Sequence, residues 1–344
     1  MVLQAIVLKS LLWADIGRID VTDSEIPHPG KGEVLIKVKY CGICGSELSA
    51  YTGHNELRKP PSVMGHEFSG NVVEAGDSSL EWMVGKLVAV NPLVTCGRCR
   101  FCASGDRQLC LERKIIGVNF SGGFGQYVSV PSYSIHEMND ALYGSLAEPL
   151  ACAVRAVRQA RVTVGDTVLI AGAGTIGLLS AKMAIAAGAS EVVMAETNSF
   201  RRELSLKYGA TAALAPDKVE EHLDRTGNRN GFDRAIDAVG YNESRNLLVR
   251  HVRRGGTVSI LGLHENRMDL DGNYVVRSET SVSGSFCYSN EDFRVATDFI
   301  NRGKLKGAEK WFEVRGARAA DKAFQDLLKP DCSVSKVILD MEDV

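Results

Sequence analysis

The segment from Thr167 to Glu196 limits the possible folds of this chain more than any other part of the sequence. It begins with Thr167–Ala171, a continuous apolar run typical of a buried strand, and the glycine-rich run Gly172–Gly177 follows directly. A helical pattern then leads to a second apolar run, Glu191–Ala195, which ends at the acidic Glu196. Strand, glycines, helix, strand and acid in this order predict a βαβ unit that binds a dinucleotide. The alternative, an ordinary βα turn, does not account for all five features.

Each part of this unit has a physical role in holding a dinucleotide. Glycines permit the tight turn, the close approach of a pyrophosphate to the backbone, and close packing of helix on strand. The N–H groups at the start of the helix favour phosphate binding. The residues expected to contact the cofactor here are Gly172, Gly174, Thr175, Ile176, Gly177 and Glu196.

The charge of Glu196 predicts the choice of cofactor. Its carboxylate can accept hydrogen bonds from the ribose hydroxyls and would repel the 2′-phosphate of NADP, so NAD is favoured. Arg201 and Arg202 are the argument against this choice, because either guanidinium could reach a phosphate.

The strand–helix alternation continues beyond this unit. Strands are expected at Phe232–Asp237 and Gly256–Gly262, with a helix from Glu243 between them. Such alternation predicts an α/β fold with a doubly wound parallel sheet, which binds ligands at the carboxyl ends of its strands. The residues expected to line the cofactor in this region are Val239, Leu261 and Phe286.

Four cysteines form a second, separate signal. Cys96, Cys99, Cys102 and Cys110 are separated by gaps of two, two and seven residues. Thiolates that converge in this way suit tetrahedral Zn²⁺ with no open position, which is a structural site. A pair of disulfides or scattered buried thiols is the alternative, and it is less favoured in a reducing compartment.

A further set of candidate ligands lies earlier, in a half of the chain that reads as short β-strands. Strands are expected at residues 5–8 and 34–38, and between them and the four cysteines lie Cys44 and the Gly65-His66-Glu67 motif. Thiolate, imidazole and carboxylate are zinc ligands, and a site with three protein ligands leaves a position for substrate. Taken singly, His66 would be a structural histidine and Cys44 a buried thiol. The nearby four-cysteine group favours the metal interpretation.

Composition narrows the function classes. The 344 residues are 45% hydrophobic and carry a net charge of −2, so neither nucleic acid nor an anionic membrane is an expected partner. No apolar run is long enough to span a bilayer. The odd count of nine cysteines argues against a secreted disulfide framework, and the N-terminus lacks the layout of a signal peptide. A cytoplasmic protein with a small-molecule substrate is expected.

Taken together, the motifs resemble those of the zinc-containing medium-chain dehydrogenase/reductase family, nearest to its sorbitol (polyol) and threonine dehydrogenase branch. The matching segments are Gly42–Glu47, Gly65–Glu67, the four cysteines, Glu148-Pro149-Leu150 and Gly172–Gly177, and they span essentially the whole chain. The resemblance implies a GroES-like catalytic domain at residues 1–150 and 290–344, with a structural zinc lobe at about 91–115. It also implies an inserted Rossmann domain at 151–289.

The resemblance implies roles for single residues. Cys44, His66, Glu67 and Glu148 resemble the ligands of a catalytic zinc, with Glu148 at a place that many alcohol dehydrogenases fill with cysteine. Glu67 and Glu148 can exchange with water, so the coordination set stays open. Ser46 matches the hydroxyl that passes the alcohol proton towards solvent, and Arg201 matches an arginine near the adenine. Two zinc ions per chain, one catalytic and one structural, are expected.

The implied activity is hydride transfer from a secondary alcohol of the polyol type to NAD, which gives the ketone. Zinc would polarise the alcohol oxygen while the nicotinamide accepts the hydride. An L-threonine-like amino-alcohol dehydrogenase is the alternative within enzymes, and a non-catalytic zinc-stabilised nucleotide-binding relative is the alternative outside them. The stretch Thr280–Ser285 resembles an edge strand that pairs between subunits, which predicts a homo-oligomer, either dimer or tetramer.

Three positions depart from the family pattern. Glu47 stands where an aspartate usually orients the zinc-binding histidine, and Ser49 stands where a histidine often extends the proton relay. Cys287 replaces an arginine that polyol dehydrogenases keep near substrate and cofactor. The last change predicts a smaller or differently functionalised secondary alcohol than a long polyol.

Overall fold

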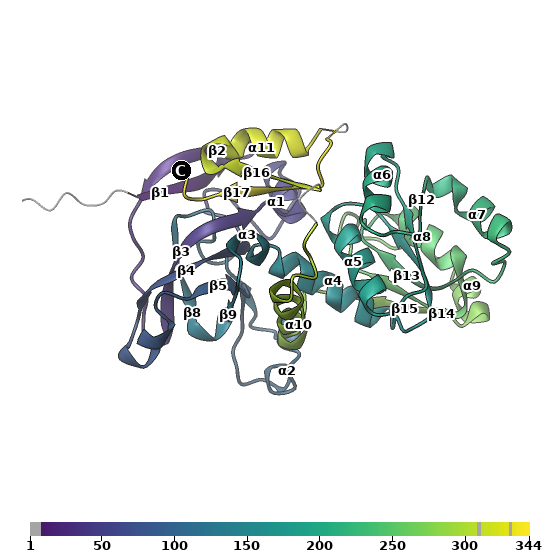
Figure 1. Ribbon diagram of the computed structural model, residues 1–344, viewed down its shortest axis with the longest axis horizontal. Helices are drawn as coiled ribbons and strands as arrows, with labels where there is room; N and C mark the ends of the chain where they lie inside the picture. Colours follow the sequence, from purple (N-terminus) through teal and green to yellow (C-terminus); the bar gives the residue numbers. More distant parts are fainter. Residues whose placement is uncertain (1–7, 308–310, 330–331) are drawn as a thin grey trace, which may run out of the picture. The chain divides into compact units, whose positions relative to one another are not determined.

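The computed structural model describes residues 8–307, 311–329 and 332–344, so most of the expected strand at 5–8 lies outside the described residues. The chain forms two compact units, one built from Met1–Glu148 with Ser289–Val344 and the other from Pro149–Tyr288. They are called unit 1 and unit 2 below. Helix α4 (Ala147–Gln159) carries the chain from unit 1 into unit 2 (Figure 1).

Unit 1 is organised around a seven-stranded sheet whose strands come from both ends of the chain. Its strand order is β16-β17-β3-β4-β5-β9, and β8 also pairs with β3. The strands are β3 (Glu33–Gly42), β4 (Glu67–Ala75), β5 (Leu87–Val90), β8 (Tyr127–Pro131), β9 (Ile135–Glu137), β16 (Phe312–Gly316) and β17 (Lys336–Asp340). Because β17 pairs with β3 in antiparallel register, the start of the C-terminal strand lies beside the segment that leads into Cys44.

The remaining elements of unit 1 flank this sheet. Two small antiparallel pairs are β1 (Leu8–Asp15) with β2 (Arg18–Ser24) and β6 (Leu93–Val94) with β7 (Lys114–Ile115). The α-helices are α1 (Gly45–Tyr51), α2 (Arg100–Ala103), α3 (Ala141–Gly144), α10 (Asn290–Asn301) and α11 (Ala320–Leu327). The 3₁₀ helices are η1 (Ser78–Met83), η2 (Arg107–Leu109), η3 (Ser132–Ser134) and η5 (Ala317–Ala319).

The core of unit 1 joins residues that are far apart in sequence. Trp13, Phe68, Phe124 and Phe324 are each at most 2% exposed and belong to one hydrophobic cluster. The ring of Phe324 on α11 lies 5.1 Å from that of Tyr51 on α1. Burying one such aromatic side chain contributes about 1.5–3 kcal/mol, so this contact anchors the C-terminal segment to the helix that follows Cys44.

Unit 2 is a doubly wound α/β unit, as the sequence predicts. Its six strands are all parallel, in the order β12-β11-β10-β13-β14-β15. The strands are β10 (Thr167–Ala171), β11 (Glu191–Ala195), β12 (Ala212–Leu214), β13 (Phe232–Asp237), β14 (Val252–Ile260) and β15 (Ser281–Gly284). The helices are α5 (Thr175–Ala186), α6 (Ser199–Lys207), η4 (Pro216–Lys218), α7 (Val219–Thr226), α8 (Asn242–His251) and α9 (Gly272–Ser278).

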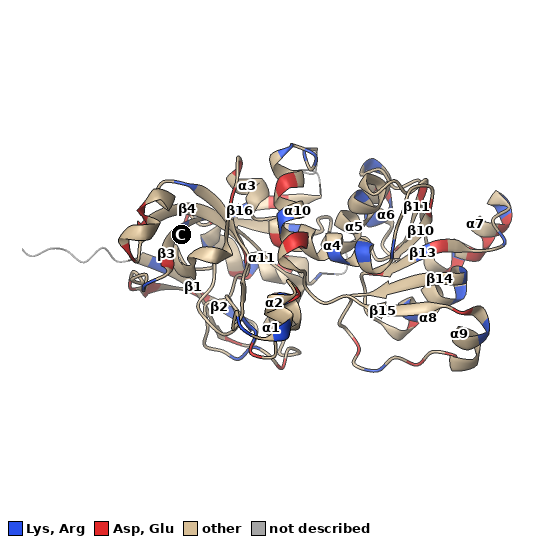
Figure 2. Ribbon diagram, turned by 90° about the horizontal axis from the view of Figure 1, so that it is seen from below, with Lys and Arg blue, Asp and Glu red and all other residues tan. Residues whose placement is uncertain are grey.

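The helices of unit 2 cover both faces of its sheet, with α5 and α6 on one side and α8 and α9 on the other (Figure 2). Strands covered on both faces are expected to be apolar along their whole length. Accordingly, every residue of β10 after Thr167 is buried, and Leu169, Phe232 and Val258 from three neighbouring strands share one core.

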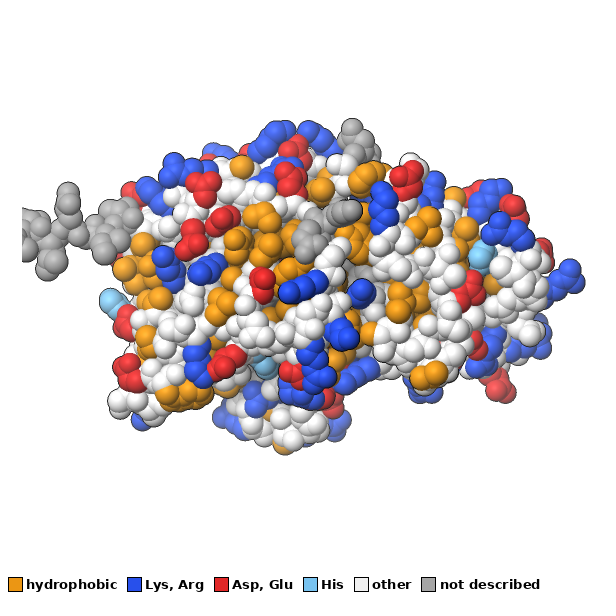
Figure 3. Space-filling view, viewed as in Figure 1, with side chains coloured by type: hydrophobic (Ala, Val, Ile, Leu, Met, Phe, Trp, Pro, Cys, Tyr) orange, Lys and Arg blue, Asp and Glu red, His pale blue; other side chains and the backbone are white. Residues whose placement is uncertain are grey.

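The surface agrees with the small net charge. Lysine and arginine side chains are interspersed with aspartate and glutamate over the face shown in Figure 3. None of the helices in the described part of the chain combines the length and apolar character needed to cross a membrane.

Candidate metal and cofactor sites

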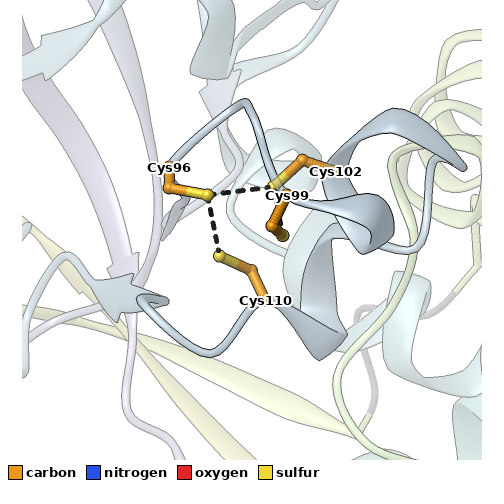
Figure 4. Close-up of side chains that lie close together, drawn as sticks. All are labelled: Cys96, Cys99, Cys102 and Cys110. Atoms are coloured by element: carbon orange, nitrogen blue, oxygen red, sulfur yellow. Dashed lines mark hydrogen bonds between the residues drawn. The ribbon is translucent and has the colours of Figure 1, made fainter.

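The four cysteines predicted to bind a structural zinc come together in one lobe of unit 1. Their side chains point toward a common centre in Figure 4, and their sulfur atoms all lie within 4.8 Å of one another. The Sγ atoms of Cys96 and Cys110 are 3.6 Å apart, and those of Cys99 and Cys102 are also 3.6 Å apart. The short helix α2 carries Cys102, with Cys99 at its start, so one turn of helix brings these two sulfurs together.

This geometry fits a tetrahedral zinc ion. With Zn–S bonds near 2.3 Å, the sulfurs of a tetrahedron lie about 3.8 Å apart. No disulfide joins any of the nine cysteines, all of which lie within the described residues. Hydrogen bonds from the backbone amides of Arg98 and Cys99 lower the pKa of the Cys96 thiol to about 6, which favours the thiolate that a metal needs.

A second group of ligand atoms forms where α1 begins and β4 begins. Cys44 caps α1, His66 directly precedes β4, Glu67 is the first residue of β4, and one ligand atom from each lies within 4.8 Å of the others. His66 is 7% exposed and Glu67 is 2% exposed. Gly65 has φ +96°, and a Cβ there would lie 2.6 Å from the amide nitrogen of Phe124, so only glycine fits before His66.

Glu47 connects these ligands from α1. One carboxylate oxygen accepts hydrogen bonds from Nδ1 of His66 (2.8 Å) and the amide of Gly65 (2.9 Å). The other accepts a hydrogen bond from the amide of Cys44 at 3.0 Å. With Nδ1 donating to Glu47, Nε2 of His66 is the ring atom that could bind a metal. The Glu47 side chain, one methylene longer than that of aspartate, therefore accepts hydrogen bonds from both His66 and the backbone amide of Cys44.

The charges of this pair are strongly coupled. Burial by itself would raise the pKa of Glu47, but the attraction of His66 and Arg58 and the bond from Cys44 lower it to about 2. Burial by itself would lower the pKa of His66, but Glu47 and Cys44 raise it well above its usual value. In the metal-free protein the pair is therefore a carboxylate and an imidazolium, and a metal ion would displace the proton.

Arg58 is part of this site, although no motif in the sequence predicts it. The residue is 7% exposed, and its Nη1 donates to the hydroxyl of Ser46 at 3.1 Å. Its Nη2 lies 3.2 Å from Nδ1 of His66 and 4.0 Å from Glu47. Nothing in the run Leu57–Pro60 distinguishes this arginine from a surface cation, so no sequence signal could have found it.

Lys336 is a second residue of this site that no sequence motif predicts. It is 1% exposed, and its Nζ donates to the carbonyl oxygen of Ile43 at 3.1 Å and forms an ion pair with Glu67. Gly42 makes room for the pair, because a Cβ there would lie 2.5 Å from the Glu67 carboxylate. Burial alone would lower the pKa of Lys336, but Glu67 and Cys44 raise it, so the lysine stays charged.

The other expected residues of this site lie close by in sequence or structure. Ser46 is half-buried in the first turn of α1, and Ser49 lies one turn later on the same helix. Glu148 is the second residue of α4 and is 7% exposed. It lies outside the group of three whose ligand atoms are within 4.8 Å of one another. The geometry thus brings Cys44, His66 and Glu67 together and leaves the role of Glu148 a proposal.

The glycine-rich run of unit 2 forms a cradle at the start of α5. Gly172 has φ +90°, and a Cβ on Gly177 would lie 1.9 Å from the carbonyl oxygen of Gly172, so helix and strand approach as closely as glycine allows. A Cβ on Gly174 would meet nothing within 4 Å, which leaves open space at the helix N-terminus. The expected contact residues Thr175 and Ile176 are the first two of α5. This open cradle fits a pyrophosphate.

Glu196 lies next to this cradle, immediately after β11. One carboxylate oxygen accepts a hydrogen bond from the amide of Ala173 at 2.7 Å, and the other accepts one from the amide of Asn198 at 2.9 Å. Arg202 donates to the carbonyl oxygens of Glu196 and Thr197 at 2.8 and 2.7 Å. These hydrogen bonds hold the Glu196 carboxylate beside the phosphate cradle, and the Arg202 guanidinium is bound to two backbone carbonyl oxygens.

Arg201 and the remaining expected contacts also have defined places. Nε of Arg201 is buried with no hydrogen-bond partner in the described part of the chain, which is the kind of donor that a bound ligand satisfies. Val239 and Leu261 follow β13 and β14 and are half-buried, whereas Phe286 is 38% exposed. Cys287, at the position where the resemblance to polyol dehydrogenases implies an arginine, has a φ of +45°.

Comparison with known proteins supports the folds of both units. Residues 30–140 match the family model for an alcohol dehydrogenase GroES-like domain, and residues 175–302 match that for a zinc-binding dehydrogenase. L-galactonate-5-dehydrogenase of Escherichia coli K12 is 36% identical over 86% of each chain. L-threonine 3-dehydrogenase of Pyrococcus horikoshii is 37% identical over 75% of this chain and 76% of its own. A probable D-xylulose reductase A of Aspergillus terreus is 33% identical over 92% of this chain and 94% of its own.

A solved structure from Sinorhizobium meliloti 1021, described as a zinc-binding dehydrogenase bound to NADP, superimposes with a TM-score of 0.89. It is 32% identical and covers 97% of this chain and 99% of its own. The fold and the relatives define a zinc-dependent, NAD(P)-dependent alcohol dehydrogenase. The chain belongs to the zinc-containing medium-chain dehydrogenase/reductase family.

Proposed function

We propose that this protein oxidises a secondary alcohol of the polyhydroxylated class, a polyol or sugar acid, to the ketone, with NAD as the hydride acceptor. The observation that carries the proposal is the group formed by half-buried Cys44 and buried His66 and Glu67, with the Ser46 hydroxyl on the helix that Cys44 caps. Relatives named for acting on L-galactonate and D-xylulose support the substrate class.

Cys44, His66 and either Glu67 or Glu148 would hold the catalytic zinc, and Cys96, Cys99, Cys102 and Cys110 the structural one. When bound, zinc lowers the proton affinity of the alcohol oxygen and NAD takes up the hydride. Glu47 keeps the Nδ1 proton on His66 and so presents Nε2 to the metal. The ion pair with Lys336 offsets the charge of Glu67 and favours Glu148 or water as the third ligand at rest.

Ser46 would exchange a proton with the alcohol at its Oγ atom. The guanidinium of Arg58 donates to this oxygen and has no lone pair with which to accept a proton. The hydrogen of Ser46 therefore points elsewhere, and the proton leaves through water. The proton takes this route because Arg58 contacts Ser46 and because position 49 is a serine and not a histidine that could relay the proton.

NAD is the proposed cofactor rather than NADP. The carboxylate of Glu196 lies beside the phosphate cradle, where it would repel a 2′-phosphate, and Arg202 is engaged by two backbone carbonyls. The relative from Sinorhizobium meliloti 1021 is described as bound to NADP, and titration of this protein with NADH and NADPH tests the assignment. Binding of NADPH as tight as that of NADH would contradict this assignment.

An L-threonine-like activity is the second candidate, supported by the Pyrococcus horikoshii relative. Absorbance of NADH with sorbitol, xylitol, L-galactonate, 2,3-butanediol and L-threonine separates the two. Turnover that is fastest with a polyol or sugar acid and lost after chelation is the expected result. Turnover with L-threonine alone would establish the second candidate. No turnover with any alcohol, together with no metal at Cys44, would instead establish a non-catalytic nucleotide-binding protein.

We further propose a cytoplasmic homo-oligomer. Nine cysteines without a disulfide fit a reducing compartment. Strand β15 is the last strand of its sheet, so one side of Ser281–Gly284 is available to pair with the same strand of a second copy. A dimer or tetramer in light scattering is expected, and a monomer at working concentration would contradict it.

A further inference from the structure

Two loops at the carboxyl ends of β13 and β14 are joined to each other backbone to backbone. A Cβ on Gly240 would lie 2.3 Å from the carbonyl carbon of Gly262, and one on Gly262 would lie 2.2 Å from the amide nitrogen of Gly240. Gly240 also has φ +96°. The amide of Glu265 donates to the carbonyl oxygen of Gly240 at 3.0 Å. We call the segments 238–241 and 261–267 the paired loops.

Asp237 organises the first of the paired loops from the end of β13. It is fully buried, and its Oδ1 accepts hydrogen bonds from the amides of Val239 (3.1 Å) and Gly240 (3.0 Å). Its backbone carbonyl accepts from the amides of Leu261 and Gly262, both at 3.1 Å, and so reaches the second loop as well. One residue thus ties together the ends of two neighbouring strands.

Arg245 organises the second loop from α8. The residue is 5% exposed, and its guanidinium donates to three backbone carbonyls: Arg267 at 2.9 Å, Glu265 at 3.1 Å and Gly262 at 3.2 Å. Its Nε lies 3.6 Å from Oδ2 of Asp237, which completes a buried ion pair. A guanidinium taken out of water is costly unless its donors are engaged, and here three carbonyl oxygens of the second loop accept its hydrogen bonds while the Asp237 carboxylate at the end of β13 balances its charge.

The paired loops lie on the side of the sheet where the second half of a dinucleotide must go. The cradle at Gly172 follows β10, and Glu196, the acid proposed to bind the ribose, lies on the β11 side. The carboxyl ends of β13 and β14 lie on the opposite side of β10. A Cβ on Gly172 would lie 2.6 Å from Cγ2 of Val239, so the first of the paired loops touches the cradle. A dinucleotide that crosses the sheet at this point has its nicotinamide half against these loops.

We propose that Arg245 is a positioning residue for the nicotinamide half of the cofactor. It does not touch the cofactor; with Asp237 it holds the paired loops in the conformation that the nicotinamide nucleotide meets on binding. Loops fixed in advance need not be ordered by the ligand, and the saved ordering cost strengthens binding. The inference rests on the nucleotide site proposed above and goes beyond it, because it assigns the two halves of the cofactor to different anchoring residues.

The test compares NADH with ADP-ribose, which lacks the nicotinamide ring. Titration calorimetry of the zinc-loaded protein is expected to show that Arg245→Met weakens NADH by about 10-fold and changes ADP-ribose less than about 2-fold. Arg245→Lys, which keeps one charged donor, is expected to fall between these values. Arg250→Met, on the exposed face of the same helix, is the matched control and leaves both affinities unchanged.

A second variant avoids altering the buried ion pair. His264 is exposed and its Nδ1 donates to the carbonyl oxygen of Val239 at 2.7 Å, while its ring stacks on Tyr241. His264→Ala is expected to weaken NADH alone, by about 3-fold.

Equal loss of NADH and ADP-ribose binding, or no loss of either in both variants, would overturn the inference. Failure of the unaltered protein to bind either ligand would overturn the nucleotide site itself, and this inference with it.

Discussion

The two candidate metal sites of unit 1 differ in what surrounds the ligands. The four cysteines provide four identical donors, and the ion pair beside them, Arg98–Glu112, is exposed at 80% and 60%. The group of Cys44, His66 and Glu67 is set among buried charges instead. Glu47 and Arg58 contact His66, and Lys336 pairs with Glu67.

The difference shows how one domain separates stability from chemistry. A closed set of four thiolates needs little outside help, because it satisfies the metal by itself. A site with an open position must hold its ligands by other means, and buried hydrogen bonds from a surrounding shell do this. If the two sites are divided in this way, variants of their ligands and of the surrounding charges should have different effects.

Replacing one cysteine in each site should separate catalysis, at the Cys44 site, from stability, at the four-cysteine site. Cys44→Ser is expected to reduce alcohol oxidation by roughly 10³-fold or more, beyond the 10–100-fold typical of residues that only support a ligand. Cys99→Ser is expected to lower the melting temperature or the assembly state while NADH still binds, because it opens the closed site. Metal analysis should show about one zinc lost in each variant.

Cys332→Ser is the control for both variants, since Cys332 belongs to neither cluster. If Cys99→Ser abolished hydride transfer in a protein that stayed folded and assembled, the four-cysteine site would not be merely structural.

Removal of Lys336 should reveal the charge that it offsets. Lys336→Met leaves the carboxylate of Glu67 buried without its partner, and breaking a buried pair in this way costs about 3–5 kcal/mol of unfolding free energy. The double variant Lys336→Met/Glu67→Gln is expected to recover most of the loss in urea unfolding. Lys322→Met breaks an exposed pair on α11 and should cost less than about 1 kcal/mol. A loss for Lys336→Met as small as that control would show that Glu67 is neutral.

Lowering the pH should reduce the free energy of unfolding of the metal-free protein, because Glu47 becomes protonated. The pKa of this carboxyl is lowered in the folded state, from 4.5 to about 2, so its contribution is present above pH 4.5 and is lost as the pH falls through about 2. At 1.36 kcal/mol per unit the loss amounts to about 3 kcal/mol. His66 acts oppositely: its raised pKa gives stability that is present below pH 6.5 and lost as the pH rises through the folded value.

Urea unfolding of the apoprotein across this pH range measures the effect. The difference between the protein and its Glu47→Gln variant should be largest near pH 4.5–6.5 and should vanish toward pH 2. A constant difference at every pH would mean that the carboxylate is not what stabilises the folded state.

The smallest expected effect is on metal affinity. Glu47→Gln keeps a hydrogen-bond acceptor for His66 but loses the negative charge, and changes of this kind weaken zinc binding by about 10–100-fold. Competition with a chelator measures the affinity of the Cys44 site, and the four-cysteine site is the internal control because Glu47 is not among its ligands. Equal weakening of both sites would indicate general destabilisation instead.

Local sequence patterns determined much of this protein. The run Gly172–Gly177 between a buried strand and a helix specifies a βαβ turn wherever it occurs, because only glycine allows that backbone approach. The spacing of Cys96, Cys99, Cys102 and Cys110 brings four sulfurs together within one lobe, since the ligands and the turn that joins them are contiguous.

Tertiary structure alone decided how these sites are held. Lys336 reads as an exposed lysine at the start of a strand, and it reaches Glu67 only because β17 pairs with β3 across nearly the whole length of the chain. Arg58 and Arg245 read as surface cations, and burial among carbonyls and carboxylates gives them their roles. A charge becomes a structural element only when its partners are brought to it from distant segments. The spacing of residues in the sequence does not show which distant side chains will be in contact, because the packing of strands and helices determines those contacts.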